Sequence, residues 1–464
     1  MVRPPTGGTN AARASAAGSS RSKAKQRGPY AVNAFFRWFP RAIASFASLA
    51  CAFAMLAPLT LRAAPRAIWT QFRLNPQNNA VIAGDLSTSW SFETGFAISA
   101  SPAIDGTRLF VGNNNGRFVA LDVRDGRLVW SRQMASSMKS QPLLWDGLVI
   151  AGEGNEIGFV HHGVVHLGAG ENALVAFDRA TGQIRWRTFL QGSGMSAPAI
   201  VDGLLVHADS DGDAVGIDPA SGHVRYARKI GTIASMSVAR PLSGGAFAIG
   251  GQTATQLAAI RAADGAVLWR YAFPRASGLG DCAPASDGVR IYCDYLLPIA
   301  PHPYVKAGER NEQHAFALQA SSGALAWDVH LEDGIVPMRN QTAIPLVDRG
   351  LVFMGSPFAP YIHALDVRTG ALRWRARVRG AVKGGIVAVG GTLYFGDLRG
   401  YLWALDERDG RVVGVKFEGT PFNVGSPVVV GGTLIVGSGT GRILAVPLAA
   451  IRAGHDAPRT RPSA

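Results

Sequence analysis

The chain has 464 residues, of which 47% are hydrophobic and 17% charged, and its 56 glycines suit a glycine-turned all-β domain with a large core. The formal net charge of +14 is concentrated at the amino terminus, because residues 1–66 contain ten Lys or Arg and no acid. The rest of the chain holds 36 basic and 32 acidic residues, a difference of +4, so it lacks the dense basic surface that nucleic-acid binding requires. No nucleic-acid partner is expected.

The amino-terminal region predicts export. Residues 1–41 form a basic segment, and residues 42–61 are an uncharged, alanine-rich run that is long enough to span a bilayer. The run also fits the core of a secretory signal peptide, but the long basic segment favours a retained inner-membrane anchor. The denser positive charge lies before the run, so that end is expected to stay cytoplasmic and the rest to be periplasmic. Ser48 to Cys51 is an imperfect lipoprotein signal, and cleavage of the leader is left open.

A repeat of eleven residues organises the chain after a lead-in at residues 62–85. Each of seven copies begins with a small residue, has glycine at the seventh place and reserves the eleventh place for an aromatic residue. A repeat of this kind decides the architecture. The eleventh places are Trp130, Trp186, Tyr226, Trp269, Trp327, Trp374 and, as an exception, Gly414.

Each repeat predicts half of a four-stranded sheet. Within a copy, two apolar runs flank a turn that ends in glycine, which supplies the positive φ. A second series of turns, such as Asp105-Gly106, precedes the copies and predicts another hairpin. A proline such as Pro102 lies in most of the first strands and cannot donate to a ladder, so that strand should be a sheet edge. The indole is expected to lock one sheet onto a slim part of the next.

One unit lacks its fourth strand. The run Arg442 to Ala445 supplies a third strand, and Leu86 to Phe92, with Trp90 in the tryptophan slot, can supply the fourth. A sheet completed by both chain ends closes a ring. The prediction is an all-β, eight-bladed β-propeller at residues 86–446, with its last blade closed by the N-terminal strand and followed by a flexible tail at 447–464. A linear solenoid, which would not need a split unit, is the rival.

Two cysteines flank the turn at Asp287-Gly288. A two-residue loop sets Cys282 opposite Cys293 and allows a disulfide in an oxidising compartment, but it puts Pro284 at a hydrogen-bonded position. A three-residue loop with a bulge suits the proline but turns the cysteines to opposite faces. Both alternatives remain open.

The eleven-residue repeat resembles the tryptophan-docking motif of the pyrroloquinoline-quinone (PQQ) repeat family, and the copies that begin at Ala176 and Ala364 match it fully. The lead-in from Trp69 to Asn79 resembles the segment that often precedes these propellers. The resemblance implies one of two functions. Some members are quinoprotein dehydrogenases that bind PQQ and calcium in the central funnel. Others are non-catalytic envelope proteins, such as the outer-membrane assembly lipoproteins, which use the propeller for docking, and the fold alone cannot choose between them.

Two long insertions, at residues 153–171 and 294–313, are candidate functional loops. Gly154 to Gly158 resembles the Gly-x-Glu-x-Gly stretch of quinoprotein alcohol dehydrogenases, which would make Glu156 a calcium ligand assisted by Asn155. Against this interpretation, the chain has no adjacent cysteine pair, lacks a recognisable Asn and Asp motif and is short for that group. The alternative is an ordinary loop carboxylate.

Histidines and methionines offer a weaker metal signal. His161 and His162 are adjacent and would point to opposite faces of a strand, so they and His166 are interpreted as surface or loop residues. Four methionines near the predicted funnel mouth suit an adaptable apolar lining better than a copper site. They are Met138, Met195, Met236 and Met338.

Four cations fall in comparable places and are the candidate cofactor-binding residues. They would make the funnel attractive to an anion, either the PQQ carboxylates or an acidic peptide, and the alternative is a set of solvated rim charges. These residues are Lys139, Arg240, Arg339 and Lys383.

The sequence therefore predicts an exported, membrane-tethered propeller that binds envelope proteins or peptides without catalysis. The alternative is a PQQ- and calcium-dependent dehydrogenase of alcohols or sugars that uses Glu156, and a metal-handling propeller is a third hypothesis. No cofactor is firmly implied, and enzymatic activity is left open.

Overall fold

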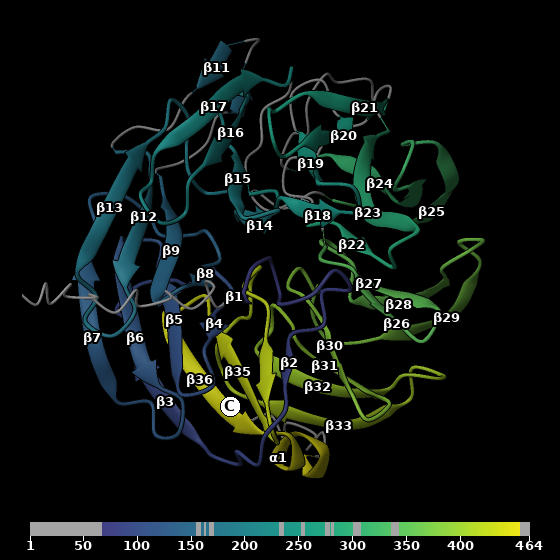
Figure 1. Cartoon of the computed structure of the whole chain (residues 1–464). Helices are drawn as coiled ribbons and strands as arrows, with labels where there is room; N and C mark the ends of the chain where they lie inside the picture. The colour runs from purple at the N-terminus through teal and green to yellow at the C-terminus, as the bar shows by residue number, and fades with distance from the viewer. Residues whose placement is uncertain are drawn as a thin grey trace, which may run out of the picture. The chain divides into compact units, whose positions relative to one another are not determined.

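The computed structural model describes residues 67–154, 159–161, 164–166, 171–231, 236–251, 256–273, 279, 283–299, 308–335 and 343–454. All of them belong to one compact unit that starts at Ala63. They form eight blades arranged as a β-propeller, with a hydrophobic core between successive sheets (Figure 1). The predicted eight-bladed fold is confirmed.

Blades one, three and four each contain four consecutive antiparallel strands, and blade two has the same four-stranded pattern with a separate hairpin between its second and third strands. Blade one contains β4 (Ala103–Ile104), β5 (Arg108–Gly112), β6 (Arg117–Asp122) and β7 (Leu128–Gln133). Blade two contains β8 (Leu143–Trp145), β9 (Leu148–Glu153), β12 (Ala173–Asp178) and β13 (Ile184–Phe189). Blade three contains β14 (Ala199–Val201), β15 (Leu204–Ala208), β16 (Asp213–Ile217) and β17 (Val224–Lys229). Blade four contains β18 (Arg240–Leu242), β19 (Ala246–Gly251), β20 (Gln256–Arg261) and β21 (Val267–Ala272).

Blades five to seven repeat this order, and blade eight is split. Blade five contains β22 (Ala285–Ser286), β23 (Arg290–Pro298), β24 (Arg310–Gln319) and β25 (Leu325–Ile335). Blade six contains β26 (Leu346–Asp348), β27 (Leu351–Gly355), β28 (Tyr361–Asp366) and β29 (Leu372–Arg377). Blade seven contains β30 (Val387–Val389), β31 (Thr392–Gly396), β32 (Tyr401–Asp406) and β33 (Val412–Phe417). Blade eight contains β34 (Val428–Val430), β35 (Thr433–Gly437), β36 (Arg442–Pro447) and β3 (Trp90–Glu93).

The ring closes as the sequence predicts. Strand β3 pairs antiparallel with β36, and Trp90 lies opposite Ala445 in the register. The N-terminal strand therefore completes the last blade.

Each docking aromatic packs on the next blade. The indole N–H of Trp90 donates to the carbonyl of Val123 over 2.9 Å, and a Cβ added to Gly126 would lie 2.5 Å from the same ring. Only glycine fits beneath the indole, which confirms the predicted lock. Five tryptophans repeat the bond: Trp130 to Arg179, Trp186 to Pro219, Trp269 to Ala320, Trp327 to Val367 and Trp374 to Glu407, while Tyr226 covers Gly265 without it.

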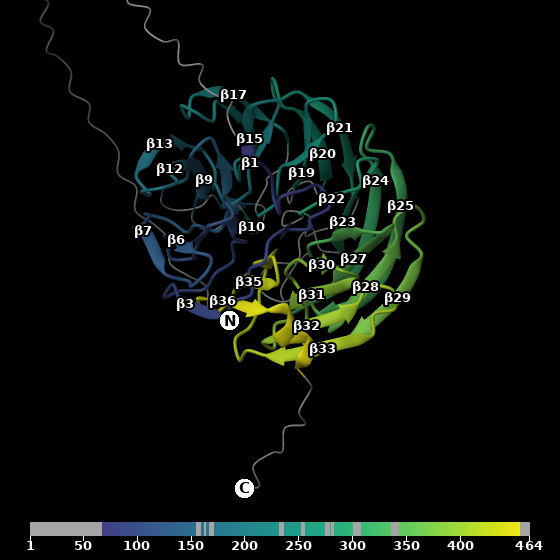
Figure 2. The same cartoon turned by 60° about the horizontal axis from the view of Figure 1, so that its bottom comes forward.

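The sequence analysis treated the lead-in as a segment separate from the propeller. In the structure, two strands of the lead-in join blades of the propeller. Strand β1 (Ala67–Trp69) pairs antiparallel with β8, and β2 (Val81–Ile82) pairs parallel with β34. The proline-bearing first strands are therefore sheet edges except in blades two and eight, where the lead-in adds a strand. The chain between β1 and β2 crosses the centre of the ring (Figure 2).

Residues 69–82, called the plug from here on, bond to several blades. Backbone carbonyls of the plug accept the N–H groups of Ile200, Ser286, Val347 and Val429 at 2.8 to 3.0 Å. These four residues belong to blades three, five, six and eight. The plug thus fills the middle of the propeller with the protein's own chain.

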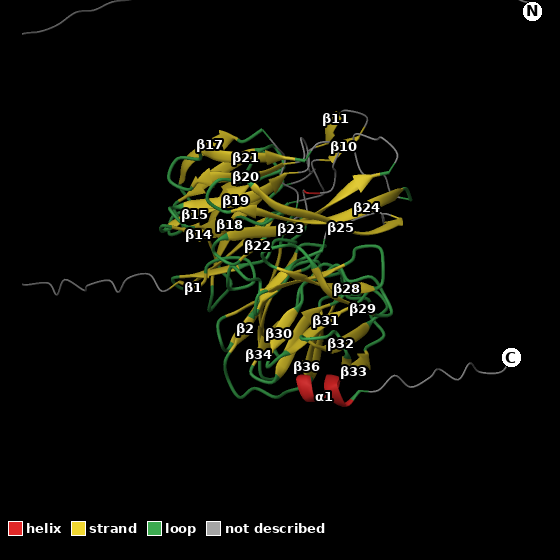
Figure 3. Cartoon of the chain, turned by 90° about the vertical axis from the view of Figure 1, so that its right-hand side faces the viewer, coloured by secondary structure: helices red, strands yellow, loops and turns green. Residues whose placement is uncertain are grey.

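The prediction of a flexible tail from residue 447 is wrong for residues 448–453, which form the helix α1 (Leu448–Ala453) (Figure 3). The helix packs on β33, and Ile451 is buried. A Cβ at Gly414 would lie 2.4 Å from the carbonyl oxygen of Ile451. The helix occupies the place that a tryptophan or tyrosine fills in the other copies, because the seventh copy has only Gly414 there.

The two predicted insertions are partly regular. In blade two, β10 (Phe159–His161) and β11 (Val164–His166) form a hairpin. In blade five, β23 and β24 extend to Pro298 and from Arg310, so much of the expected loop is strand. No helix in the described ranges combines the length and apolar character needed to cross a bilayer, and the anchor or signal core predicted at residues 42–61 lies outside those ranges.

Candidate functional site

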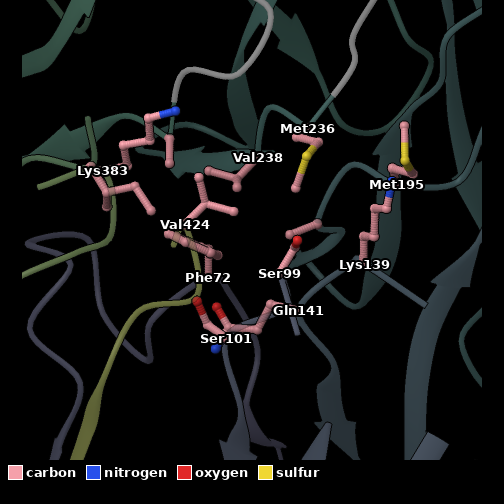
Figure 4. Close-up of a pocket in the computed structure, with 13 residues that line it drawn as sticks. Phe72, Ser99, Ser101, Lys139, Gln141, Met195, Met236, Val238, Lys383 and Val424 are labelled. Atoms are coloured by element: carbon pink, nitrogen blue, oxygen red, sulfur yellow. The ribbon is translucent and has the colours of Figure 1, made fainter. Parts of the chain in front are cut away.

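A cavity lies on the axis of the ring. Each of the eight connections between consecutive blades contributes at least one lining residue (Figure 4). The empty volume of about 480 Å³ includes space that is open to the solvent. The apolar lining is Phe72, Met195, Ala197, Met236, Val238, Ala283, Ile344 and Val424, and the polar lining is Ser99, Ser101, Lys139, Gln141 and Lys383.

The plug closes one end of this cavity. Phe72 of the plug is part of the lining, and the next residue, Arg73, donates its backbone N–H to Oε1 of Gln141 over 3.0 Å. Gln141 in turn donates from Nε2 to the carbonyl of Pro102. A ligand would therefore enter from the side of the loops that join the blades.

Two of the four predicted cations line the cavity. Lys139 precedes blade two and Lys383 precedes blade seven, and they lie on opposite sides of the cavity in Figure 4. Lys383 is only 5% exposed. Arg339 lies outside the described residues.

Arg240 lies in the interface with the plug instead. Its side chain is fully buried, its Nε donates to the carbonyl of Pro284 over 2.7 Å, and its Nη1 donates to Oε1 of Gln71 over 2.7 Å. It also bonds to Oδ1 of Asn78. Its position at the start of a blade is as predicted, but its side chain holds the plug.

Arg73, which the sequence analysis did not single out, is a second fully buried arginine. Its Nε donates to the carbonyl of Asn78 over 2.7 Å, and its Nη2 donates to that of Ile386 over 2.6 Å. Burial, and then the charge of Arg240, lower the pKa of Arg73 to about 9. Burial alone lowers the pKa of Arg240 to about 9. The sequence held one signal that could have drawn attention to Arg73, namely the resemblance of the lead-in to the segment that often precedes these propellers.

The predicted methionine lining is found in part. Met195 and Met236 line the cavity, and Met138 is buried where a Cβ on Gly112 would collide with it. Met338 lies outside the described residues.

The described residues do not form a calcium site. Glu156, Asn155 and His162 lie outside them, and within them no group of three or more His, Cys, Asp or Glu could hold a metal ion. The neighbouring Glu153 is described, but it accepts the N–H of Ser136 over 2.9 Å and pairs with Arg187 at 3.0 Å. The carboxylates of PQQ would suit Lys139 and Lys383, whereas calcium prefers hard oxygen ligands such as carboxylates, and the described lining contains no carboxylate.

Blade five carries an ionisable network away from the cavity lining. The ring nitrogens of His314 lie 2.9 Å from Oδ1 of Asp328 and 3.0 Å from Oε2 of Glu312. Tyr295 donates to the second oxygen of Asp328 over 2.7 Å. Burial alone would lower the pKa of His314, but the two carboxylates outweigh it and raise the pKa. The network ties the three long strands of this blade together.

Cys293 is buried and disulfide-bonded. Cys282 lies outside the described residues, so its pairing with Cys293 stays a prediction. His161 ends β10 and His166 ends β11.

Comparison with known proteins places this geometry among related propellers. The family model described as outer membrane protein assembly factor BamB matches residues 66–161, 152–287 and 311–452. Tetrathionate hydrolase from Acidithiobacillus ferrooxidans is 26% identical over 353 residues, which cover 72% of this chain and 70% of that protein.

Two solved structures share the fold. BamB from Moraxella catarrhalis aligns with a TM-score of 0.58 and 16% identity, covering 78% of this chain and 99% of that one. A quinohemoprotein alcohol dehydrogenase from Comamonas testosteroni aligns with a TM-score of 0.59 and 13% identity, covering 84% of this chain and 82% of that one. At these identities the likeness extends to the propeller fold alone.

Proposed function

The chain belongs to the family described as outer membrane protein assembly factor BamB, and from that premise we propose that it is an exported scaffold that binds envelope proteins or peptides without catalysis. Residues 42–61 would tether it to the inner membrane, with the propeller in the periplasm. The cavity side of the ring would be the docking face.

The observation that carries this proposal is the exposure of large apolar side chains on the cavity side. Phe189 is 66% exposed and ends β13, just before Met195 of the cavity lining. Ile335 is 60% exposed and ends β25, in the connection that reaches Ile344. Phe96, in the connection before Ser99, and Phe417, which ends β33 before Val424, are also exposed. Exposed aromatic side chains are enriched at protein interfaces.

The chemistry of the cavity also supports binding over catalysis. Its described lining contains lysine, serine and glutamine side chains but no carboxylate, imidazole or thiol. Such a lining offers donors and apolar contacts to a partner, whereas general acid–base or nucleophilic chemistry usually uses the missing groups. Lys139 and Lys383 would face acidic groups of the partner.

A capture experiment tests the proposal. The full-length chain, purified in detergent and immobilised, is incubated with solubilised envelope proteins of the source organism, and retained proteins are identified by mass spectrometry. Phe189→Asp and Ile335→Asp should each weaken retention by roughly tenfold or more, as for interface hot spots. Leu372→Asp is the control, because Leu372 is 55% exposed but begins β29, at the end of an outer strand away from the cavity. Equal retention by all variants, or no retained protein, would exclude this docking face.

A second candidate function is the hydrolysis of tetrathionate, the activity named for the relative from Acidithiobacillus ferrooxidans. The observation that favours it is the position of Lys139 and Lys383 on opposite sides of a largely apolar cavity. Tetrathionate carries a negative sulfonate at each end and a non-polar sulfur chain between them, so it matches that pattern. Consumption of tetrathionate by the purified chain, lost in Lys383→Gln, would support this candidate, and no consumption over a range of pH would exclude it.

The dehydrogenase alternative has less support, because its calcium ligands would have to come from residues such as Glu156 outside the described parts. An absorbance scan after incubation with PQQ and Ca²⁺, together with dye reduction by alcohols or sugars, tests it directly. Absence of both bound quinone and dye reduction would exclude it.

A further inference from the structure

Two buried positive charges lie in the plug interface without a described counter-charge. Arg73 and Arg240 are each 0% exposed, and their hydrogen-bond acceptors among the described residues are backbone carbonyls and the side-chain amides of Gln71 and Asn78. No ion pair joins either arginine to a carboxylate within the described part of the chain. Buried charges in proteins are normally paired, because taking an unpaired ion out of water is strongly unfavourable.

The two arginines also repel each other. Both guanidinium groups bond to Asn78, so they lie close enough to interact, and the charge of Arg240 disfavours the charged form of Arg73. Neutral oxygen acceptors solvate them in part. An anion nearby would supply the missing compensation.

Arg73 lies directly beside the cavity. Its neighbour Phe72 and its acceptor Gln141 both line that space. Nη1 of Arg73 is buried and has no hydrogen-bond partner among the described residues. That nitrogen lies against Gly385, where an added Cβ would be 1.9 Å from it and 2.7 Å from Oγ of Ser426.

The contact at Gly385 links this nitrogen to the cavity wall on two sides. Ser426 donates its backbone N–H to Oγ of Ser101, a lining residue, over 2.9 Å. Lys383, another lining residue, lies two positions before Gly385 in the same connection. The buried guanidinium therefore adds to the positive potential of the lysine-bearing wall.

From this geometry we infer that the cavity is a binding site for a small dianion with an apolar middle, and that the bound dianion supplies the counter-charge that Arg73 and Arg240 lack. Lys139 and Lys383 would contact its two charged ends, and Met195, Met236 and Val238 would pack against its middle. Clefts lined by one sign of charge with apolar walls concentrate ligands of the opposite sign. Binding would also stabilise the plug, because Phe72 is part of the same site.

This inference names the ligand class of the cavity used by the second candidate function and rests on that candidate only for the site, not on turnover or on the docking face. It needs only the cavity and its cations, so it can fail while protein capture succeeds, and the reverse. A carboxylate or a sulfonate would satisfy the same charges, because guanidinium and ammonium groups bind both.

The test is ligand-dependent thermal unfolding of the full-length chain in detergent. The probes are succinate and ethane-1,2-disulfonate, with acetate and methanesulfonate as monoanion controls at equal ionic strength. At least one dianion should raise the unfolding midpoint in a saturable manner, as expected for a ligand that binds only the folded state. Each monoanion should raise it much less.

Lys139→Gln and Lys383→Gln should each weaken the apparent affinity for that dianion by roughly tenfold, the loss typical of a close charge pair. Lys229→Gln is the matched control, because Lys229 is 61% exposed on β17 and pairs with Asp211 and Asp213 away from the cavity lining. Arg73→Met should abolish the dianion effect. If that variant does not fold, the two lysine variants decide the question.

Three results would overturn the inference. They are an absence of any saturable shift, an equal shift with monoanions at matched ionic strength, and an undiminished shift in both lysine variants. Isothermal calorimetry with the same probes provides an independent readout of binding.

Discussion

Trp90 lies opposite Ala445, so the first blade-forming strand and the last one share a single sheet. The indole of Trp90 also donates to Val123 and covers Gly126 of blade one. One side chain thus takes part in both the closing sheet and the lock between blades eight and one.

Trp90→Ala should therefore lower the free energy of unfolding by about 3 kcal/mol, at the lower end of the range for Trp→Ala because the side chain is only partly buried. Denaturant unfolding followed by circular dichroism measures the loss. Trp90→Phe should lose less, since it keeps a ring over Gly126 and forfeits mainly the hydrogen bond to Val123. If the alanine variant were as stable as the parent chain, closure of the ring would not depend on this contact.

The glycine beneath each indole can be tested in isolation. Gly370 has φ +72°, and a Cβ there would lie 2.8 Å from the ring of Trp327. Gly147 has φ +80° but nothing within 4 Å of an added Cβ. Gly147→Ala should cost about 1 kcal/mol for the left-handed backbone alone, whereas Gly370→Ala should cost a further 1–3 kcal/mol for the collision. Equal losses in the two variants would contradict the docking role of the glycine.

The repeat made the blades predictable from sequence because each glycine and each tryptophan answers a local requirement. A turn with positive φ needs glycine at a place such as Gly126, and the indole above it needs that glycine to lack a side chain. Such constraints recur once per blade and leave a period in the sequence. Closure of the ring by the strand that contains Trp90 was predictable because counting the strands leaves the last blade one strand short.

The plug left no comparable signal. Apart from the short pairing of β2 with β34, its contacts are isolated hydrogen bonds to the inner edges of different blades, such as those of Asn78 with the carbonyls of Ala283 and Pro345. Residues that are distant in sequence meet there only because the ring brings them together. For the same reason Arg240 looked equivalent to Lys383 by position, yet it bonds to the plug while Lys383 lines the cavity. One feature of the sequence pointed to the helix α1. The seventh copy of the repeat has Gly414 at the place where the other copies have an aromatic residue.

Glu407 should make the propeller less stable as the pH rises toward neutrality. Its side chain is buried, both carboxylate oxygens lack a hydrogen-bond partner in the described residues, and Nε of Arg349 is 3.7 Å away. Burial, and then the charge of Asp348, raise the pKa of Glu407 to about 7. The folded state thus binds more protons than the unfolded state between the usual carboxyl pKa and about 7, so the free energy of unfolding falls as pH rises through that window.

Glu407→Gln removes this titration and should flatten the fall. Unfolding midpoints measured from pH 4.5 to 7.5 in the parent and the variant check it. If the unfolding midpoint of the parent rises with pH through this window, and the difference in midpoint between the parent and the variant stays constant, Glu407 is not the titrating group.

His207 should have the opposite effect at acid pH. It lies fully buried in β15, and neither ring nitrogen has a hydrogen-bond partner in the described part of the chain. Burial lowers the pKa of His207 to about 3, whereas an unfolded histidine titrates near its usual value of about 6.5. Below that usual value the unfolded state binds the extra proton, so the free energy of unfolding decreases as pH falls from about 6.5 toward 3.

His207→Leu should keep or raise stability at pH 7.5, because it replaces a buried polar ring that lacks partners with an apolar side chain. The same variant should also lose less stability between pH 6.5 and 4. The control is His223→Leu, which changes an exposed histidine of the turn before β17 and should leave the dependence of the free energy of unfolding on pH unchanged. An identical slope in the parent and in His207→Leu would mean that His207 is not the source of acid sensitivity.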